Sequence, residues 1–120
     1  MGRDLAVERL RLEALLTAKP GAKVFTPFGP DVPIYKVLGK VFALYNAAED
    51  AVTLKCDPHL AEILRETHEE ITPGHHVERR HWIAVALDGG LDDAQVVGLI
   101  DQSYDLVCAK LTRAQRASIA

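Results

Sequence analysis

The stretch IYKVLGKVFALYN, from Ile34 to Asn46, decides the fold class of this chain. Strand-forming residues stand on both sides of Leu38-Gly39, and glycine tolerates the positive φ that a tight turn requires. The stretch therefore predicts a β-hairpin with arms at residues 34–37 and 40–45. Alternation along the second arm predicts two faces: Val41, Ala43 and Tyr45 on one, and Lys40, Phe42 and Leu44 on the other.

The segments after this hairpin predict another strand and two helices. Residues 51–56 alternate with period two and predict a third strand after a turn at 46–50. Asp57-Pro58 is typical of a helix start, because aspartate caps the free amides and proline fits the first turn. Asp92, with Gln95 three residues later, predicts the start of the last helix.

The whole chain, residues 1–120, is expected to form one domain with the order helix, three strands, helix, two strands, helix. Asp4 would cap the first helix, Thr72-Pro73-Gly74 would end the second helical unit, and the second hairpin would bend at 78–80. The polar tail from Thr112 is expected to fray. Strands joined by short turns pair antiparallel, so we expect a two-layer α+β fold with the helices on one face of an antiparallel sheet.

The composition is that of an ordinary globular chain with a slightly acidic balance. Hydrophobic residues make up 48% of the 120 residues, enough for one modest core. The 14 Lys and Arg residues face 17 Asp and Glu, which gives a formal net charge of -3. Proteins that coat nucleic acid nonspecifically are normally basic overall, so any contact with phosphates would have to come from a local cluster.

The sequence also predicts where the protein resides and how its thiols are used. No apolar run approaches the roughly 20 residues of a membrane span, and the charged opening MGRDLAVERLRLEALL is not typical of a signal peptide. We therefore expect a cytoplasmic protein with no membrane partner. Cys56 and Cys108 are isolated and form no CxxC pair, so buried thiols are the expected state of both, and no cofactor is expected.

A family resemblance rests on short stretches that occur in unbroken order along nearly the whole chain. They are PFG at 27–29, YKVLGKVFAL at 35–44, LKCDP at 54–58, LRE at 64–66, HHVERRHW at 75–82, LDGGL at 87–91 and DQSYDLVCAKL at 101–111. Together they resemble the MmcQ/YjbR family of small bacterial proteins. The resemblance implies an α+β fold similar to that of secretion chaperones, and a DNA-binding role through a "double-wing" motif.

This chain departs from the usual family pattern at three positions. Members usually have a tyrosine in place of His75, an asparagine in place of Glu78 and a lysine in place of Arg79. The change at Glu78 puts a negative charge beside the basic pair, which weakens the implied DNA-binding role in this chain.

The stretch GHHVERRHW, from Gly74 to Trp82, raises the question of a metal site. His76 and His81 could face each other across a hairpin, with Glu78 or His68 as a third zinc ligand. The chain contains neither HExxH nor CxxC, and surface or hydrogen-bonded histidines explain the run as well. The sequence therefore favours no metal site.

Catalysis has little support in the sequence. Ser103 is predicted to lie inside a helix, without the exposed strand-to-helix elbow of a nucleophilic serine, so we expect it to make a structural hydrogen bond. Cys56 would be a redox thiol only if Lys55 lowered its pKa, and neighbours on a strand point to opposite faces. We expect a protein that is not an enzyme.

Contact with a polyanion is the function that the charged residues favour most. Two hairpin tips that carry cations could straddle double-stranded DNA, and the planar fork of arginine bonds two phosphate oxygens at once. The alternative is that these tips are simply solvated. The candidate phosphate-binding residues are Lys36, Lys40, Lys55, His76, Arg79, Arg80 and His81.

Two other binding roles stay open. A protein partner, as for secretion chaperones, would use aromatic residues such as Phe28, Trp82 and Tyr104, although core packing is the expected role of Trp82. A small molecule would bind in a cleft bounded by Lys36, Lys55 and His81. The oligomeric state does not follow from the sequence.

Overall fold

The computed structural model describes residues 5–74 and 77–120. In chain order the elements are α1 (Leu5–Thr17), β1 (Ala22–Phe25), β2 (Ile34–Val37), β3 (Lys40–Asn46), β4 (Ala51–Lys55), α2 (Pro58–Thr67), β5 (Ile71–Pro73), β6 (Trp82–Ala86), α3 (Asp93–Cys108) and α4 (Arg113–Ile119). Within the described ranges, no helix combines the length and the apolar content needed to cross a bilayer.

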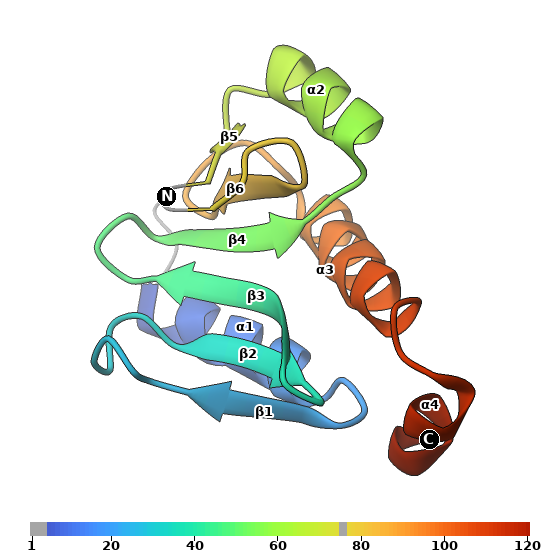
Figure 1. Cartoon of the computed structure of the whole chain (residues 1–120). Coiled ribbons are helices and arrows are strands. Elements are labelled where there is room, and N and C mark those ends of the chain that lie inside the picture. Colours follow the sequence, from blue (N-terminus) through green and yellow to red (C-terminus); the bar gives the residue numbers. More distant parts are fainter. Residues whose placement is uncertain (1–4, 75–76) are drawn as a thin grey trace.

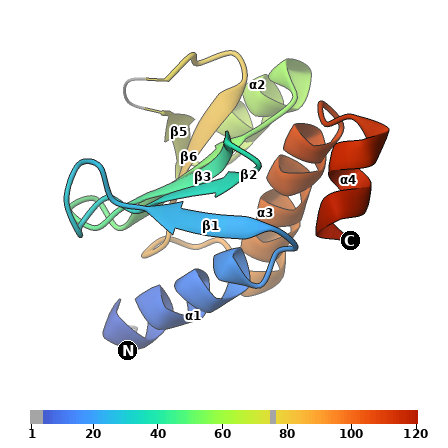
Figure 2. The same cartoon turned by 60° about the horizontal axis from the view of Figure 1, so that its bottom comes forward.

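The six strands form one sheet in the order β1-β2-β3-β4-β6-β5, and every neighbouring pair is antiparallel (Figure 1). Helices α1 and α3 cover one face of this sheet, and α2 packs against β5 and β6 at the far edge (Figure 2). The α+β class and the antiparallel sheet are therefore confirmed, while α2 lies at the edge beside β5 and β6.

The hairpin predicted at 34–46 is present, with a tight turn at Leu38 and Gly39, whose φ angles are 47° and 81°. Strict alternation along β3 is wrong, because a bulge makes Phe42 an extra residue between the register pairs of Ala43 and Val41. Phe42 and Ala43 are both fully buried in the core, whereas Val41 is only partly buried. The bulge thus turns Phe42 toward the helices.

Three elements differ from the predicted order. Residues 22–25 form an added edge strand, β1, which pairs with β2. The stretch Ile71–Pro73 pairs with β6 as β5, so the second hairpin starts before Gly74. The tail from Thr112 is helical: Thr112 caps α4 in a capping box, and Ile119 packs against the core beside Gly21. A tertiary contact thus holds a segment whose local sequence predicts fraying.

The predicted helix starts after the hairpin are confirmed. Asp57 accepts hydrogen bonds from the backbone nitrogens of His59 and Leu60, each at 3.1 Å, and Pro58 follows in the first turn. Asp92 and Gln95 form the predicted capping box of α3. The predicted cap at Asp4 lies outside the described residues.

Helix α3 is locked onto the sheet by two polar side chains. The hydroxyl of Ser103 donates to the carbonyl of Phe42 at 2.6 Å and accepts from the backbone nitrogen of Lys55 at 2.8 Å. The Tyr104 ring meets Phe42 edge to face at 5.4 Å, and its hydroxyl donates to the carbonyl of Pro20 at 2.5 Å. The predicted structural role of Ser103 is confirmed, and the bond crosses to the sheet.

Candidate nucleic-acid interface

The antiparallel strands divide their connections between two ends of the sheet. One end holds the β2–β3 turn at 38–39, the end of β4 at Lys55 and the start of β6 at Trp82, and we call it the basic end. The other end holds the connections 26–33, 47–50, 68–70 and 87–92, and we call it the acidic end.

The connections at the acidic end carry carboxylates and no lysine or arginine. Their acidic residues are Asp31, Glu49, Asp50, Glu69, Glu70, Asp88 and Asp92. Helix α1 brings two arginines near this end, and each is paired with a carboxylate: Arg9 with Glu13, and Arg11 with Asp93.

Lysines come toward the basic end from four neighbouring strands. Lys36 on β2 lies directly opposite Lys23 on β1, and like charges at such a cross-strand position repel each other. The ammonium group of Lys36 lies 5.1 Å from the centre of the Phe25 ring. Lys40 begins β3 and is exposed, and Lys55 ends β4 opposite Trp82.

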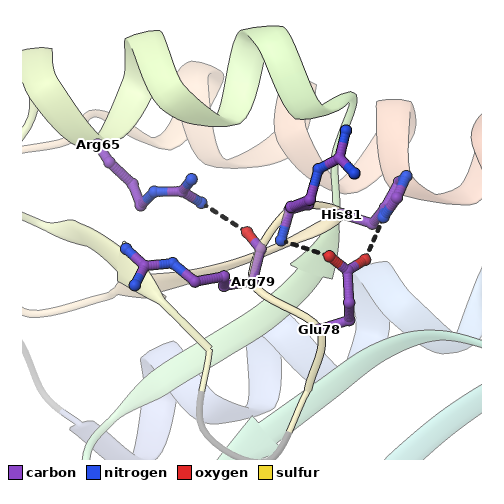
Figure 3. Close-up of polar contacts among 5 residues, drawn as sticks. Arg65, Glu78, Arg79 and His81 are labelled. Atoms are coloured by element: carbon purple, nitrogen blue, oxygen red, sulfur yellow. Dashed lines mark hydrogen bonds and ion pairs between the residues drawn. The ribbon is translucent and has the colours of Figure 1, made fainter.

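The segment 78–81 adds the second group of cations and folds around Glu78. The Glu78 carboxylate accepts from the backbone nitrogen of Arg80 at 2.9 Å and is paired with the ring nitrogen Nδ1 of His81 (Figure 3). The guanidinium of Arg65 on α2 donates to the carbonyl of Arg79 at 3.0 Å, which ties this segment to the helix (Figure 3). The carboxylate of Glu78 is therefore engaged within its own turn.

The two arginines of this segment face α2. Arg79, Arg80 and Arg65 line a groove of about 940 Å³ between α2 and β5. The same groove is lined by three carboxylates, those of Glu62, Glu66 and Glu69. Their negative charges balance the three guanidinium charges.

Five of the candidate residues form no ion pair in the described part of the chain, whereas His81 is paired with Glu78. Within residues 5–74 and 77–120, none of the following forms an ion pair with a carboxylate: Lys36, Lys40, Lys55, Arg79 and Arg80. Lys19, by contrast, is paired with Asp101.

The structure brings together most of the predicted set. Lys40, Lys55 and His81 share the basic end, and Lys36 lies shortly before its turn with its ammonium group over the Phe25 ring. Arg79 and Arg80 adjoin this end on the α2 side, and His76 lies outside the described residues. Sequence reasoning missed Lys23, Arg65 and Lys110. The β1–β2 register would have revealed Lys23, but no local signal places Arg65 or Lys110, because tertiary packing alone brings them to this region.

The sequence model of the YjbR family matches residues 17–106. The chain belongs to the YjbR family. It is 40% identical over 89 residues to the uncharacterized protein YjbR of Escherichia coli K12, with 72% of this chain and 75% of that protein covered. It is 31% identical over 108 residues to the uncharacterized protein YbdF of Escherichia coli O157:H7, with 88% of this chain and 84% of that protein covered.

Two solved structures of similar proteins have the same fold. The crystal structure of Deinococcus radiodurans protein DR2400, a DUF419 domain, superimposes with a TM-score of 0.82 at 33% identity and covers 94% of this chain and 86% of its own. A Pseudomonas syringae protein superimposes with a TM-score of 0.71 at 26% identity, covering 82% and 97%. The family membership expected from the sequence is therefore confirmed.

The carboxyl group of Glu78 has a lowered pKa. The hydrogen bond to His81 is the main cause that holds the pKa of the Glu78 carboxyl below its ordinary value, and the bond from the Arg80 amide adds to it. A depressed pKa contributes stability above the pKa of the unfolded chain, and this contribution is lost as the pH falls through the folded value.

We expect the pKa of Glu78 to rise toward the ordinary value for glutamate in a His81→Ala variant, because the hydrogen bond that lowers it is lost. Carboxyl NMR chemical shifts recorded over an acid titration measure this change. A His59→Ala variant is the control, because exposed His59 makes no described contact with Glu78. An unchanged Glu78 pKa in His81→Ala would contradict the pairing.

The described residues support neither a metal site nor a reactive thiol. Among residues 5–74 and 77–120, no three His, Cys, Asp or Glu side chains gather as they would around a metal ion, and His75 and His76 lie outside these ranges. Cys56 is buried, and burial is the main cause that raises the pKa of its thiol, followed by the charge of Asp57. A raised pKa leaves little reactive thiolate at neutral pH.

The aromatic residues considered for a protein partner do not form one surface. Phe28 is 73% exposed but lies in the 26–33 connection at the acidic end. Trp82 lies at the basic end and is partly buried, while Tyr104 is buried against Phe42. Burial is the main cause that raises the pKa of Tyr104 to about 12, so its hydroxyl remains a donor at neutral pH.

Proposed function

We propose that this YjbR-family protein binds the phosphate backbone of double-stranded DNA with its basic end and catalyses no reaction. The observation that carries the proposal is the separation of charge along the strands. Lysines with no ion pair among the described residues gather at one end, where Asp57 and Glu78 also lie, and the connections at the other end carry carboxylates but no lysine or arginine. A local cluster of this kind attracts a polyanion even though the net charge is -3.

The spacing of the two cationic segments supports a grip on a duplex. The 38–39 turn and the start of β6 are separated by two and a half strand positions in the sheet. At a strand spacing of about 4.8 Å this amounts to about 12 Å, comparable to the width of about 12 Å of the DNA major groove. Phosphates on the two sides of a groove can therefore meet Lys40 and Arg80 together.

Phosphate contacts without contacts to base edges give nonspecific binding. The dissociation constant is expected to be about 10⁻⁴ to 10⁻⁶ M at physiological salt, and binding should weaken steeply as salt rises, because each neutralised phosphate releases counterions. The proposal includes no sequence preference, because contacts to phosphates carry no direct base information.

The test is a titration of a fluorescent blunt-ended duplex over a salt series. Lys36→Gln/Lys40→Gln should bind more weakly and flatten the slope of log affinity against log salt by about 0.9 for each lost phosphate contact. Arg79→Ala/Arg80→Ala is expected to have a similar effect.

The control variant Arg9→Gln/Arg11→Gln removes two positive charges near the acidic end. It also changes the net charge from -3 to -5, yet it should bind like the wild type, because both arginines are already paired with carboxylates. Equal weakening of the control, or no wild-type binding even at low salt, would overturn the proposal.

A further inference from the structure

A separate cleft opens at the basic end, beside the last turn of α3. It measures about 380 Å³, within the range of about 300–1,000 Å³ for small-ligand sites. Its lining comes from the end of β4 at Lys55, the start of β6 at Trp82 with His81 before it, Leu106 in the last turn of α3, and Lys110 just after that helix. Lys36, which the sequence suggested as a boundary of such a cleft, does not line it.

The charged groups that line this cleft are two lysines, two carboxylates and His81. Two carboxylates line it, but both are occupied: Asp57 caps α2, and Glu78 bonds to the Arg80 amide and to His81. The ammonium groups of Lys55 and Lys110 form no ion pair within the described part of the chain. Hydrogen bonds hold both carboxylates to neighbouring groups but do not remove their charge, so Lys55 and Lys110 are the groups that would hold one phosphate.

The cleft also offers a surface for an aromatic ring. Trp82 is the only tryptophan of the chain, and Lys55 is its cross-strand partner. Leu106 and Pro58 add apolar surface to the lining. Aromatic side chains next to cations are the combination on which unpaired nucleic-acid bases stack, because every base has a π-face.

The walls of the cleft are held in place by hydrogen bonds. The backbone nitrogen of Lys55 donates to Ser103, and the backbone nitrogen of Cys56 donates to the carbonyl of His81 at 2.7 Å. These bonds fix the end of β4 against both α3 and the segment before β6. Little conformational entropy of the site is therefore lost when a ligand binds.

We infer that this cleft binds one nucleotide whose base is unpaired, with the base against Trp82 and the phosphate between Lys55 and Lys110. The inference rests on the proposed function in that it names the part of a nucleic acid that the basic end would recognise. The same chemistry is offered by a free nucleoside monophosphate and by an unpaired nucleotide at the end of a duplex.

The test uses the emission and the indole N–H NMR signal of Trp82 with three probes. AMP carries both ring and phosphate, adenosine lacks the phosphate, and inorganic phosphate lacks the ring. AMP should change both signals in a saturable manner, and each partial probe should bind at least tenfold more weakly. Lys110→Gln should weaken AMP binding at least tenfold. Arg113→Gln also removes one positive charge, but at an exposed residue that does not line the cleft, and it should leave AMP binding unchanged.

A second comparison separates the two sources of the nucleotide. A duplex with a single-stranded overhang that binds more tightly than the blunt duplex, and displaces AMP, assigns the cleft to nucleic-acid ends. Binding of AMP without any effect of the overhang assigns it to free nucleotides.

The inference fails if AMP leaves the Trp82 signals unchanged, if phosphate alone binds as tightly as AMP, or if Arg113→Gln weakens AMP binding as much as Lys110→Gln. Blunt-duplex binding that depends on Lys36 and Lys40 would survive that failure, since neither residue lines the cleft. Conversely, AMP binding without any duplex binding would overturn the proposed function and leave the cleft as a nucleotide site.

Discussion

A Phe42→Ala variant is expected to lose about 4 kcal/mol of unfolding free energy, because a fully buried phenylalanine in a packed core is replaced by a cavity. The β3 bulge turns this side chain toward Tyr35, at 6.5 Å between ring centres, and toward Tyr104. The loss can be measured by urea denaturation of the variant and the wild type.

Leu44→Ala is the matched control for the bulge. Strict alternation would put Phe42 and Leu44 on the same face. Both would then be core residues, and truncating either would cost a similar unfolding free energy. With the bulge, Leu44 is only partly buried, and its truncation is expected to cost about 1 kcal/mol. A loss for Leu44→Ala as large as that for Phe42→Ala would contradict the bulge.

A Ser103→Ala variant is expected to lose about 3 kcal/mol of stability, because both backbone partners of a fully buried hydroxyl are left without a hydrogen bond. The bulge lies in the pairing of β2 with β3, and the register pairs of β3 with β4 end at Ala43 and Leu54. Beyond that pair, the hydroxyl bridges the carbonyl of Phe42 and the amide of Lys55. Thermal unfolding should show a melting temperature lower by roughly 10 °C.

Ser118→Ala provides the same chemical change in an exposed setting. The Ser118 hydroxyl donates to the carbonyl of Gln115 at 2.6 Å on the surface of α4, where water can replace the bond. This variant should unfold within about 0.5 kcal/mol of the wild type. If the two alanine variants are equally stable, the hydrogen bonds of Ser103 do not stabilise the fold.

The features that the sequence predicts correctly are those encoded by neighbouring residues. The Asp57-Pro58 start and the Asp92–Gln95 box satisfy helix amides within one turn, and the Leu38-Gly39 turn needs only its own backbone angles. Such features form wherever the local pattern occurs, so they can be read without tertiary information.

The features that escaped prediction depend on distant contacts. The bulge at Phe42 is stabilised by Ser103 and Tyr104, some 60 residues later in the chain. Helix α4 holds a capping box that could be read from Thr112 and Gln115, but its place in the fold depends on Ile119 against Gly21. Local propensity cannot report such contacts.

The candidate site was predictable in its chemistry and less so in its geometry. The residue types at Lys36, Lys40 and Lys55 suggested anion binding, and the strand order brings them to one end. The side to which Arg79 turns depends on α2, because Arg65 holds its carbonyl.

The separation of charge along the strands makes the molecule a permanent electric dipole. Its orientation in solution will follow any nearby field, and its chromatographic behaviour will not follow its net charge alone. We expect a sulfonate cation exchanger to bind the lysines and retain the protein at neutral pH despite a formal charge of -3. A quaternary ammonium anion exchanger is expected to retain it through the carboxylates.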